Sequence, residues 1–198
     1  MDTMTKKYIE TVQVSDIPWH RLTTTYGRAT DFPTELDVLW NMESMEAVDA
    51  AGEALELNIE HQSTLWHATP FTMIFLLRIF KKAQEERAHN EVAQYLAEQL
   101  VELFTVIAEC IRDGLVLEHA DPLPCFDDML NEEYLWSEEY DEDEDVLRYE
   151  EDDVFPDDLF FSFYYYSQQV LLLAIPLLDT SNEGEAKLLG LISANRSV

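Results

Sequence analysis

The chain has 198 residues, 47 % hydrophobic and 12 % aromatic, which is enough to bury a core, so we expect one domain over residues 1–198. The formal net charge is −29, because 41 Asp and Glu residues stand against 12 Lys and Arg. Such a chain is repelled by nucleic acid and by anionic lipid, so its charge argues against direct binding to either and predicts a basic protein partner.

The N-terminal residues predict an arm outside the helical domain. Lys6 and Lys7 are followed by no apolar h-region, which predicts no secretory signal and a cytoplasmic protein. Weak alternation over residues 8–14 predicts a short strand or extended arm within residues 1–18. Farther on, the spacing of Cys110 and Cys125 matches no metal-ligand or redox motif, so we expect both to be buried free thiols.

Two short helices are expected after this arm. Asp31 is placed as the N-cap of the first, with Pro33 in its first turn. A second helix begins near Ser44 and continues to about residue 59 with apolar residues at helical spacing. Gly52 lies inside it, where we expect it to permit a close helix contact at some cost in helix propensity.

The longer helices follow. Thr69 and Pro70 predict the N-cap and first turn of an apolar helix over residues 71–83, and another helix is expected over residues 91–113. Residues 159–178 approach the length of a bilayer span, but internal glutamines and flanking acids favour a core helix. A last helix starts at Asn182, with Glu185 three residues on. The pattern is all-α.

Residues 126–158 form the acidic segment, with 17 carboxylates against one base, Arg148. Self-repulsion among so many like charges destabilises a compact state. We therefore expect the acids to serve binding and not folding. Apolar and aromatic residues among the acids indicate a docked acidic surface, and the alternative is a solvated loop without a partner. The expected partner contacts are Trp136, Glu138, Glu139, Tyr140, Asp141, Asp143, Glu150 and Asp152.

Motifs for chemistry are weak in this sequence. His61 and His67 match no metal-ligand spacing, and we expect histidines in such a loop to bond backbone. The acids from Asp141 to Asp145 begin like a calcium loop, but a valine follows where that loop needs glycine. Nucleophile-elbow, P-loop and dinucleotide motifs are absent from the sequence, so we predict no catalytic site, no metal and no cofactor.

Two blocks of the chain resemble a family of bacterial HEAT-repeat-like proteins. The blocks are IPWHRLTTTYGRATDFP at residues 17–33 and IEHQSTLWHATPFTMIFLLRIF at residues 59–80, and together they cover part of the first 83 residues. Ser63 and Leu65 depart from the glycine and valine that such proteins often have there. The matching positions are Trp19, Leu22, Tyr26, Gly27, Ala29, Asp31, Pro33, His61, Gln62, Thr64, Ala68, Thr69, Pro70 and Phe71.

This resemblance implies a short, irregular HEAT-like stack of antiparallel helix pairs, interrupted by the acidic insert at residues 126–158. It also implies a role as the immunity partner of a bacterial toxin. With the charge, it predicts a non-enzymatic protein that occludes a basic, nuclease-like toxin domain. Two alternatives stay open, a DNA-mimic regulator of a DNA-binding protein and a hydrolase whose site the motifs do not reveal. The sequence does not indicate the oligomeric state.

Overall fold

The computed structural model describes residues 1–114, 121–143, 145 and 155–195. These residues are mostly helical, as predicted, and two small antiparallel hairpins join them. The helices are α1 (Thr3–Thr11), α2 (Phe32–Asn41), α3 (Met45–Ile59), α4 (Ala68–Glu86), α5 (Glu91–Gly114), α7 (Asp157–Leu172) and α8 (Glu183–Asn195). The hairpins pair β1 (Thr23–Thr24) with β2 (Gly27–Arg28), and β3 (Glu60–His61) with β4 (Thr64–Leu65).

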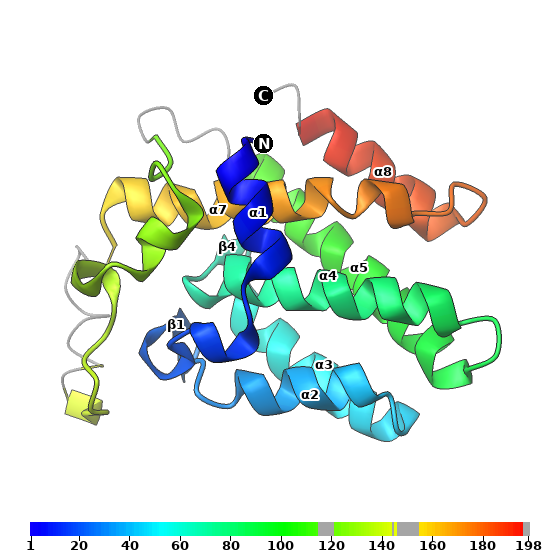
Figure 1. Cartoon of the computed structure of the whole chain (residues 1–198), viewed down its shortest axis with the longest axis horizontal. Coiled ribbons are helices and arrows are strands. Elements are labelled where there is room, and N and C mark those ends of the chain that lie inside the picture. The colour runs from blue at the N-terminus through cyan, green and yellow to red at the C-terminus, as the bar shows by residue number, and fades with distance from the viewer. Residues whose placement is uncertain (115–120, 144, 146–154, 196–198) are drawn as a thin grey trace.

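The helices pack in pairs around α4 and α5. Helix α2 lies against α3, α4 against α5, and α7 lies over both α4 and α5, while α8 packs along α5 (Figure 1). Helix α4 is buried on nearly every side, as expected for a helix with apolar residues all round. Phe80 on α4 meets Phe104 on α5 edge to face, with ring centroids 5.6 Å apart. Across the described residues we detect no regular solenoid.

The N-terminal arm is a helix, so the predicted strand or extended arm is wrong. Asp2 caps α1, because its side chain accepts hydrogen bonds from the backbone N–H of Met4 at 2.8 Å and of Thr5 at 3.0 Å. The hydroxyl of Thr5 also donates to this carboxylate at 2.6 Å, and this bond, with the backbone bonds, lowers the pKa of Asp2 to about 2. Tyr8 of this helix stacks on Phe126 with ring centroids 5.1 Å apart. The capping aspartate and this stacking favour a helix over the strand that the alternating residues predicted.

The helix predicted over residues 159–178 is shorter than expected. Helix α7 ends at Leu172, and a separate 3₁₀ turn follows at Ile175–Leu177. Pro176 accounts for the break, because it has no N–H for the helical ladder and restricts the residue before it. No helix in the described ranges has the length and hydropathy that a membrane span requires.

Two predicted caps differ from expectation. Asp31 stands directly before α2, but its backbone is helical and its side chain makes no capping hydrogen bond. Thr69 lies inside α4, where its hydroxyl accepts from the N–H of Trp66 at 2.9 Å and donates to the carbonyl of Ile59 at 2.6 Å. The threonine therefore ties α4 to the end of α3 instead of opening the helix.

Candidate protein-binding surface

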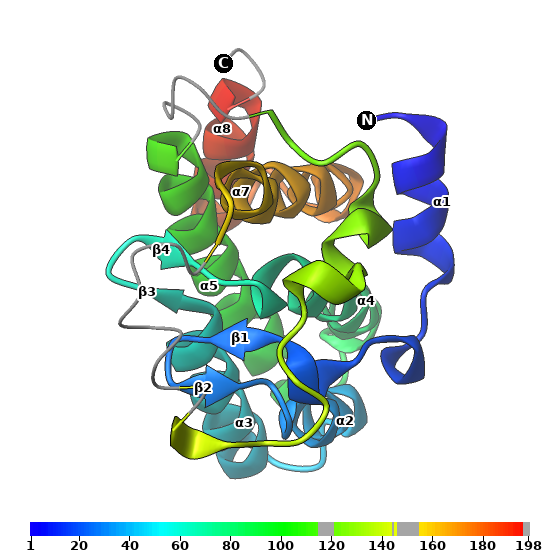
Figure 2. The ribbon, with the colours of Figure 1, turned by 90° about the vertical axis from the view of Figure 1, so that its left-hand side faces the viewer.

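The described part of the acidic segment packs against the residues around β1 and β2, at one end of the molecule (Figure 2). Four of its apolar residues are buried, namely Phe126, Met129, Leu135 and Trp136. Phe126 packs among the rings of Tyr8, Phe71 and Tyr166. The N–H of Trp136 donates to the carbonyl of Arg21 at 3.1 Å. These residues are therefore part of the fold, and a wholly solvated loop does not describe them.

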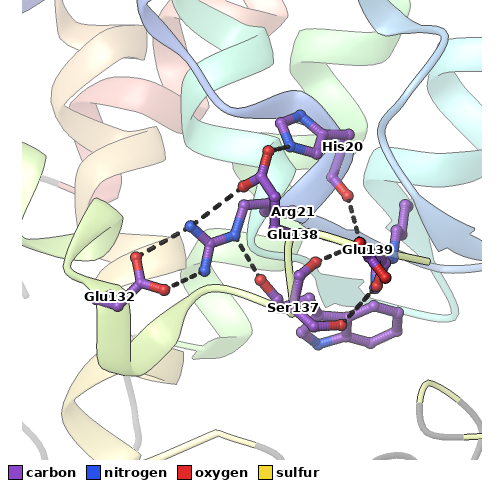
Figure 3. A network of polar contacts seen from close by, with 8 residues as sticks. His20, Arg21, Glu132, Ser137, Glu138 and Glu139 are labelled. Atoms are coloured by element: carbon purple, nitrogen blue, oxygen red, sulfur yellow. Dashed lines mark hydrogen bonds and ion pairs between the residues drawn. The ribbon is translucent and has the colours of Figure 1, made fainter. Parts of the chain in front are cut away.

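Arg21 holds the middle of the segment. Its guanidinium donates two hydrogen bonds to the carboxylate of Glu132, at 2.5 and 3.0 Å, and its Nε donates to the carbonyl of Trp136 at 2.5 Å (Figure 3). The bonds between Arg21 and Glu132 raise the pKa of Arg21 and lower the pKa of Glu132. Paired bonds of this kind fix geometry as well as charge. They lock the segment in register with the N-terminal block.

Arg28 holds the end of the described segment from inside. Its side chain is 4 % exposed and pairs with Asp145, which is 9 % exposed, at 2.7 Å. Its remaining N–H groups donate to the carbonyls of His20 at 2.9 Å and Ser137 at 2.7 Å and, at 3.3 Å, to that of Glu139. A buried charge is tolerated when every donor is satisfied, and Arg28 meets that condition.

Two aromatic rings complete the surroundings of Arg28. Its guanidinium carbon lies 5.3 Å from the ring centroid of Trp136 and 5.4 Å from that of Tyr140. Cation–π contacts of this geometry add to the ion pair. Sequence reasoning missed both arginines, although each is one of the few bases in an acidic chain, because nothing local in the sequence shows which acid a base will meet.

The eight predicted contact residues fall into three groups. Glu138, Glu139, Asp141 and Asp143 are exposed, as predicted for a surface that meets a partner. Tyr140 is 67 % exposed although one side of it faces Arg28, whereas Trp136 is only 2 % exposed. The indole of Trp136 thus lies in the contact that docks the segment. Glu150 and Asp152 lie outside the described residues.

One of the exposed carboxylates is also tied to the fold. Nε2 of His20 lies 3.0 Å from the carboxylate of Glu138, and a guanidinium nitrogen of Arg21 lies 3.7 Å from the other oxygen (Figure 3). Because the Glu138 side chain is 71 % exposed, both contacts contribute little to stability. They orient Glu138 while leaving it accessible.

The two hairpins lie at the same end of the molecule as this segment (Figure 2). Tyr26, at the first turn, is 67 % exposed, and its ring meets the ring of His61 at 5.6 Å. In the second turn, Gln62 and Ser63 adopt left-handed φ angles of 52° and 64°, which are uncommon for residues other than glycine. The two blocks that carry the family resemblance therefore meet here.

His67 behaves as predicted for a structural histidine. Its Nε2 lies 2.8 Å from the carbonyl of Met129, and its ring stacks on Phe163 with centroids 5.3 Å apart. Complete burial lowers its pKa to about 4, against which the bond to Met129 acts weakly. His67 therefore locks the acidic segment onto α4 as a neutral imidazole.

Groups that could hold a metal are few in the described ranges. The sulfur of Cys125 and the carboxylates of Asp127 and Asp128 lie within 4.8 Å of one another. Burial and these acids raise the pKa of Cys125, which disfavours the thiolate that binds metals. In the calcium-like stretch, Asp145 is occupied by Arg28. Cys110 is a buried free thiol, as predicted, and burial raises its pKa to about 12.

This end of the molecule combines exposed carboxylates with exposed aromatic rings. Exposed carboxylates and the exposed Tyr26 and Tyr140 lie on segments that hydrogen bonds hold in place. Comparisons with protein-family models, with curated proteins and with solved structures returned no match.

Proposed function

We propose that this protein is a non-enzymatic binding protein that occludes a basic protein partner with its acidic end. In concrete terms, we propose an immunity protein that neutralises a nuclease-like toxin domain in the cytoplasm. The observation that supports this most is the exposed row Glu138, Glu139, Asp141 and Asp143 on a segment fixed by Arg21 and Arg28.

The distribution of positive charge supports the same proposal. Seven Lys and Arg residues of the described ranges form ion pairs within the chain, namely Lys6, Arg21, Arg28, Lys82, Arg87, Arg112 and Lys187. An eighth base, Arg78, donates to the carbonyl of Ile9. The outward field is therefore strongly negative, and such a field accelerates encounter with a basic protein and repels acidic ones.

Preorganisation of the segment supports a stable complex. Ordering a flexible loop at an interface costs free energy that subtracts from affinity. In this chain that cost is met during folding, because Trp136 is buried and Arg28 bonds to Asp145 and Ser137. The carboxylates thus meet a partner from a surface that is already ordered.

The arrangement of helices is consistent with the implied family. We propose that α2 with α3, α4 with α5, and α7 with α8 are the members of a short, irregular HEAT-like stack. The packing of α4 against α2, α3 and α7 supports it. Repeat proteins of this kind present broad surfaces for protein partners.

Binding kinetics with the product of an adjacent toxin gene test the function. The combined variant Glu138→Gln, Glu139→Gln, Asp141→Asn and Asp143→Asn should lower the on-rate at low salt and flatten its salt dependence. A control that neutralises the exposed Glu43, Glu46, Glu85 and Glu91 changes the net charge equally and should have the smaller effect. Equal effects of both variants would leave no role for this surface. Capture of a host DNA-binding protein, displaced by DNA, would support the DNA-mimic alternative.

A further inference from the structure

A second surface lies away from the acidic segment, in a groove of about 220 Å³ between α3 and α5. Buried leucines make its floor, and they are Leu39, Leu55, Leu76, Leu96, Leu100 and Leu103. Three exposed acids of α3, Asp49, Glu53 and Glu56, stand along one rim. The groove therefore combines an apolar base with a negatively charged edge.

Gly52 opens this groove. The sequence predicted that Gly52 permits a close helix contact, but a Cβ at this position would meet nothing within 4 Å. The prediction is therefore wrong, since no neighbouring helix fills the space. Glycine inside a helix lowers stability relative to residues with a side chain. Because Gly52 has no side chain, the leucine floor stays accessible.

Tyr95 bridges the groove from the other helix. Its hydroxyl donates to a carboxylate oxygen of Asp49 at 2.6 Å, which joins α5 to α3 across one edge. The ring is half-buried and lines the groove beside Leu96. The bridge fixes the spacing of the two helices and places an aromatic ring beside the acids.

The negative charges at the groove are not balanced by positive ones. Among the described residues, no Lys or Arg lines it. The pKa of Glu56 is raised, first by partial burial and then by the negative charges of Glu60, Glu102 and Glu53. A positive charge placed here would relieve that repulsion.

We propose that this groove binds one basic side chain of a protein partner, an arginine in preference to a lysine. The aliphatic stem would lie on the leucines beneath Gly52, as long basic side chains do on apolar surfaces. The guanidinium would meet Glu53 and Glu56 and could stack against Tyr95, since its planar fork suits both carboxylates and rings. That this side chain belongs to a basic protein rests on the proposed function.

The size and charge of the groove select this occupant. Small-molecule sites usually enclose about 300–1,000 Å³, so a groove of about 220 Å³ suits one side chain better than a cofactor. Acids on the rim repel phosphates, carboxylates and nucleic acid. A purely apolar side chain would fill the floor but leave the repulsion among the acids unchanged.

The direct test is an NMR titration of the whole ¹⁵N-labelled protein with N-acetyl-arginine amide, which carries the cation without a carboxylate. We expect saturable shifts of the Gly52 amide, which is one of only five glycine signals. N-acetyl-lysine amide should bind more weakly. N-acetyl-citrulline amide, which has the same shape without the charge, should shift Gly52 at least tenfold less at equal concentration.

Matched variants separate the groove from general effects. Gly52→Leu should abolish the titration while the midpoint of thermal unfolding stays equal or rises, because leucine favours the helix and its Cβ meets open space. Gly190→Leu on α8 is the control, since its Cβ also meets nothing within 4 Å. It should keep the titration unchanged.

The outcomes are distinguishable from those for the acidic segment. Retained binding in Gly52→Leu, or equal binding of the citrulline compound, would overturn the proposal. Neutralising Glu138, Glu139, Asp141 and Asp143 should leave the Gly52 titration intact, so the groove can stand even if the acidic segment binds nothing. If both surfaces serve one partner, Gly52→Leu should speed dissociation of that complex at least tenfold and leave the salt dependence of its on-rate unchanged.

Discussion

Helix α4 and the docked acidic segment both pack against the rest of the chain, but different forces hold them. Around α4 the contacts are apolar, with Phe71, Phe80 and their neighbours fully buried. The acidic segment also depends on Arg21 and Arg28, whose hydrogen bonds reach residues more than 100 positions away. Apolar packing tolerates substitution, whereas a buried charge depends on its one partner.

Removing the buried arginine should have the largest effect. Arg28→Ala leaves Asp145 without its partner, and breaking a buried ion pair in this way costs about 3–5 kcal/mol. Chemical denaturation of the variant should show this loss. Hydrogen exchange should show earlier opening of residues 132–143 than of α4. If α4 and the segment open together, the two regions are one cooperative unit and the contrast between them fails.

Arg28→Met with Asp145→Leu is the paired control. It removes both charges and keeps apolar volume, so it should recover part of the stability that Arg28→Ala loses. Recovery would assign the loss to the orphaned carboxylate. An unchanged loss would instead assign it to the hydrogen bonds from Arg28 to His20 and Ser137.

His67 joins the two regions and should make stability depend on pH. Its pKa is about 4 in the folded protein and about 6.5 in the unfolded chain, so the unfolded chain binds the proton first as pH falls. The contribution of neutral His67 is complete above pH 6.5 and declines between pH 6.5 and 4, by about 3 kcal/mol at most.

Denaturation curves of the wild type and His67→Gln at several pH values measure this contribution. Glutamine can still donate to the carbonyl of Met129 but does not titrate, so the variant should lose stability less steeply over that range. His61→Gln is the control, because His61 lies at a hairpin, only partly buried. Parallel curves for the wild type and His67→Gln would show that His67 does not link the regions as described.

Gly114 tests how closely two helices approach. Gly114 is the last residue of α5, one residue beyond the helix predicted over residues 91–113, and it faces Tyr164 of α7. A Cβ there would overlap the ring of Tyr164, so Gly114→Ala should cost about 1–3 kcal/mol. Adding Tyr164→Leu should remove part of that cost, as a thermal-unfolding cycle would measure. Additive effects would contradict the contact.

These contrasts explain what the sequence could predict. The core helices follow from apolar periodicity, which reports burial directly, as with Leu96, Leu100 and Leu103. The exposed acids were found because charge favours the surface. The roles of Arg28 and Trp136 depend on contacts with residues far away in sequence, and so does the open space at Gly52. The local sequence pattern does not indicate such contacts.

The smallest expected effect concerns two helix caps that look alike in sequence. The hydroxyl of Ser44 accepts a hydrogen bond from the N–H of Ala47 at 3.2 Å, whereas the side chain of Asp31 makes no such bond to α2. Ser44→Ala should therefore cost about 0.5–2 kcal/mol, and Asp31→Ala should stay within about 0.5 kcal/mol of the wild type. Urea denaturation of both variants checks the difference. Both positions are exposed, so the comparison isolates the cap itself. A larger loss in Asp31→Ala would mean that the carboxylate caps α2 in solution, and that α2 depends on a polar contact of its own just as the acidic segment depends on Arg28.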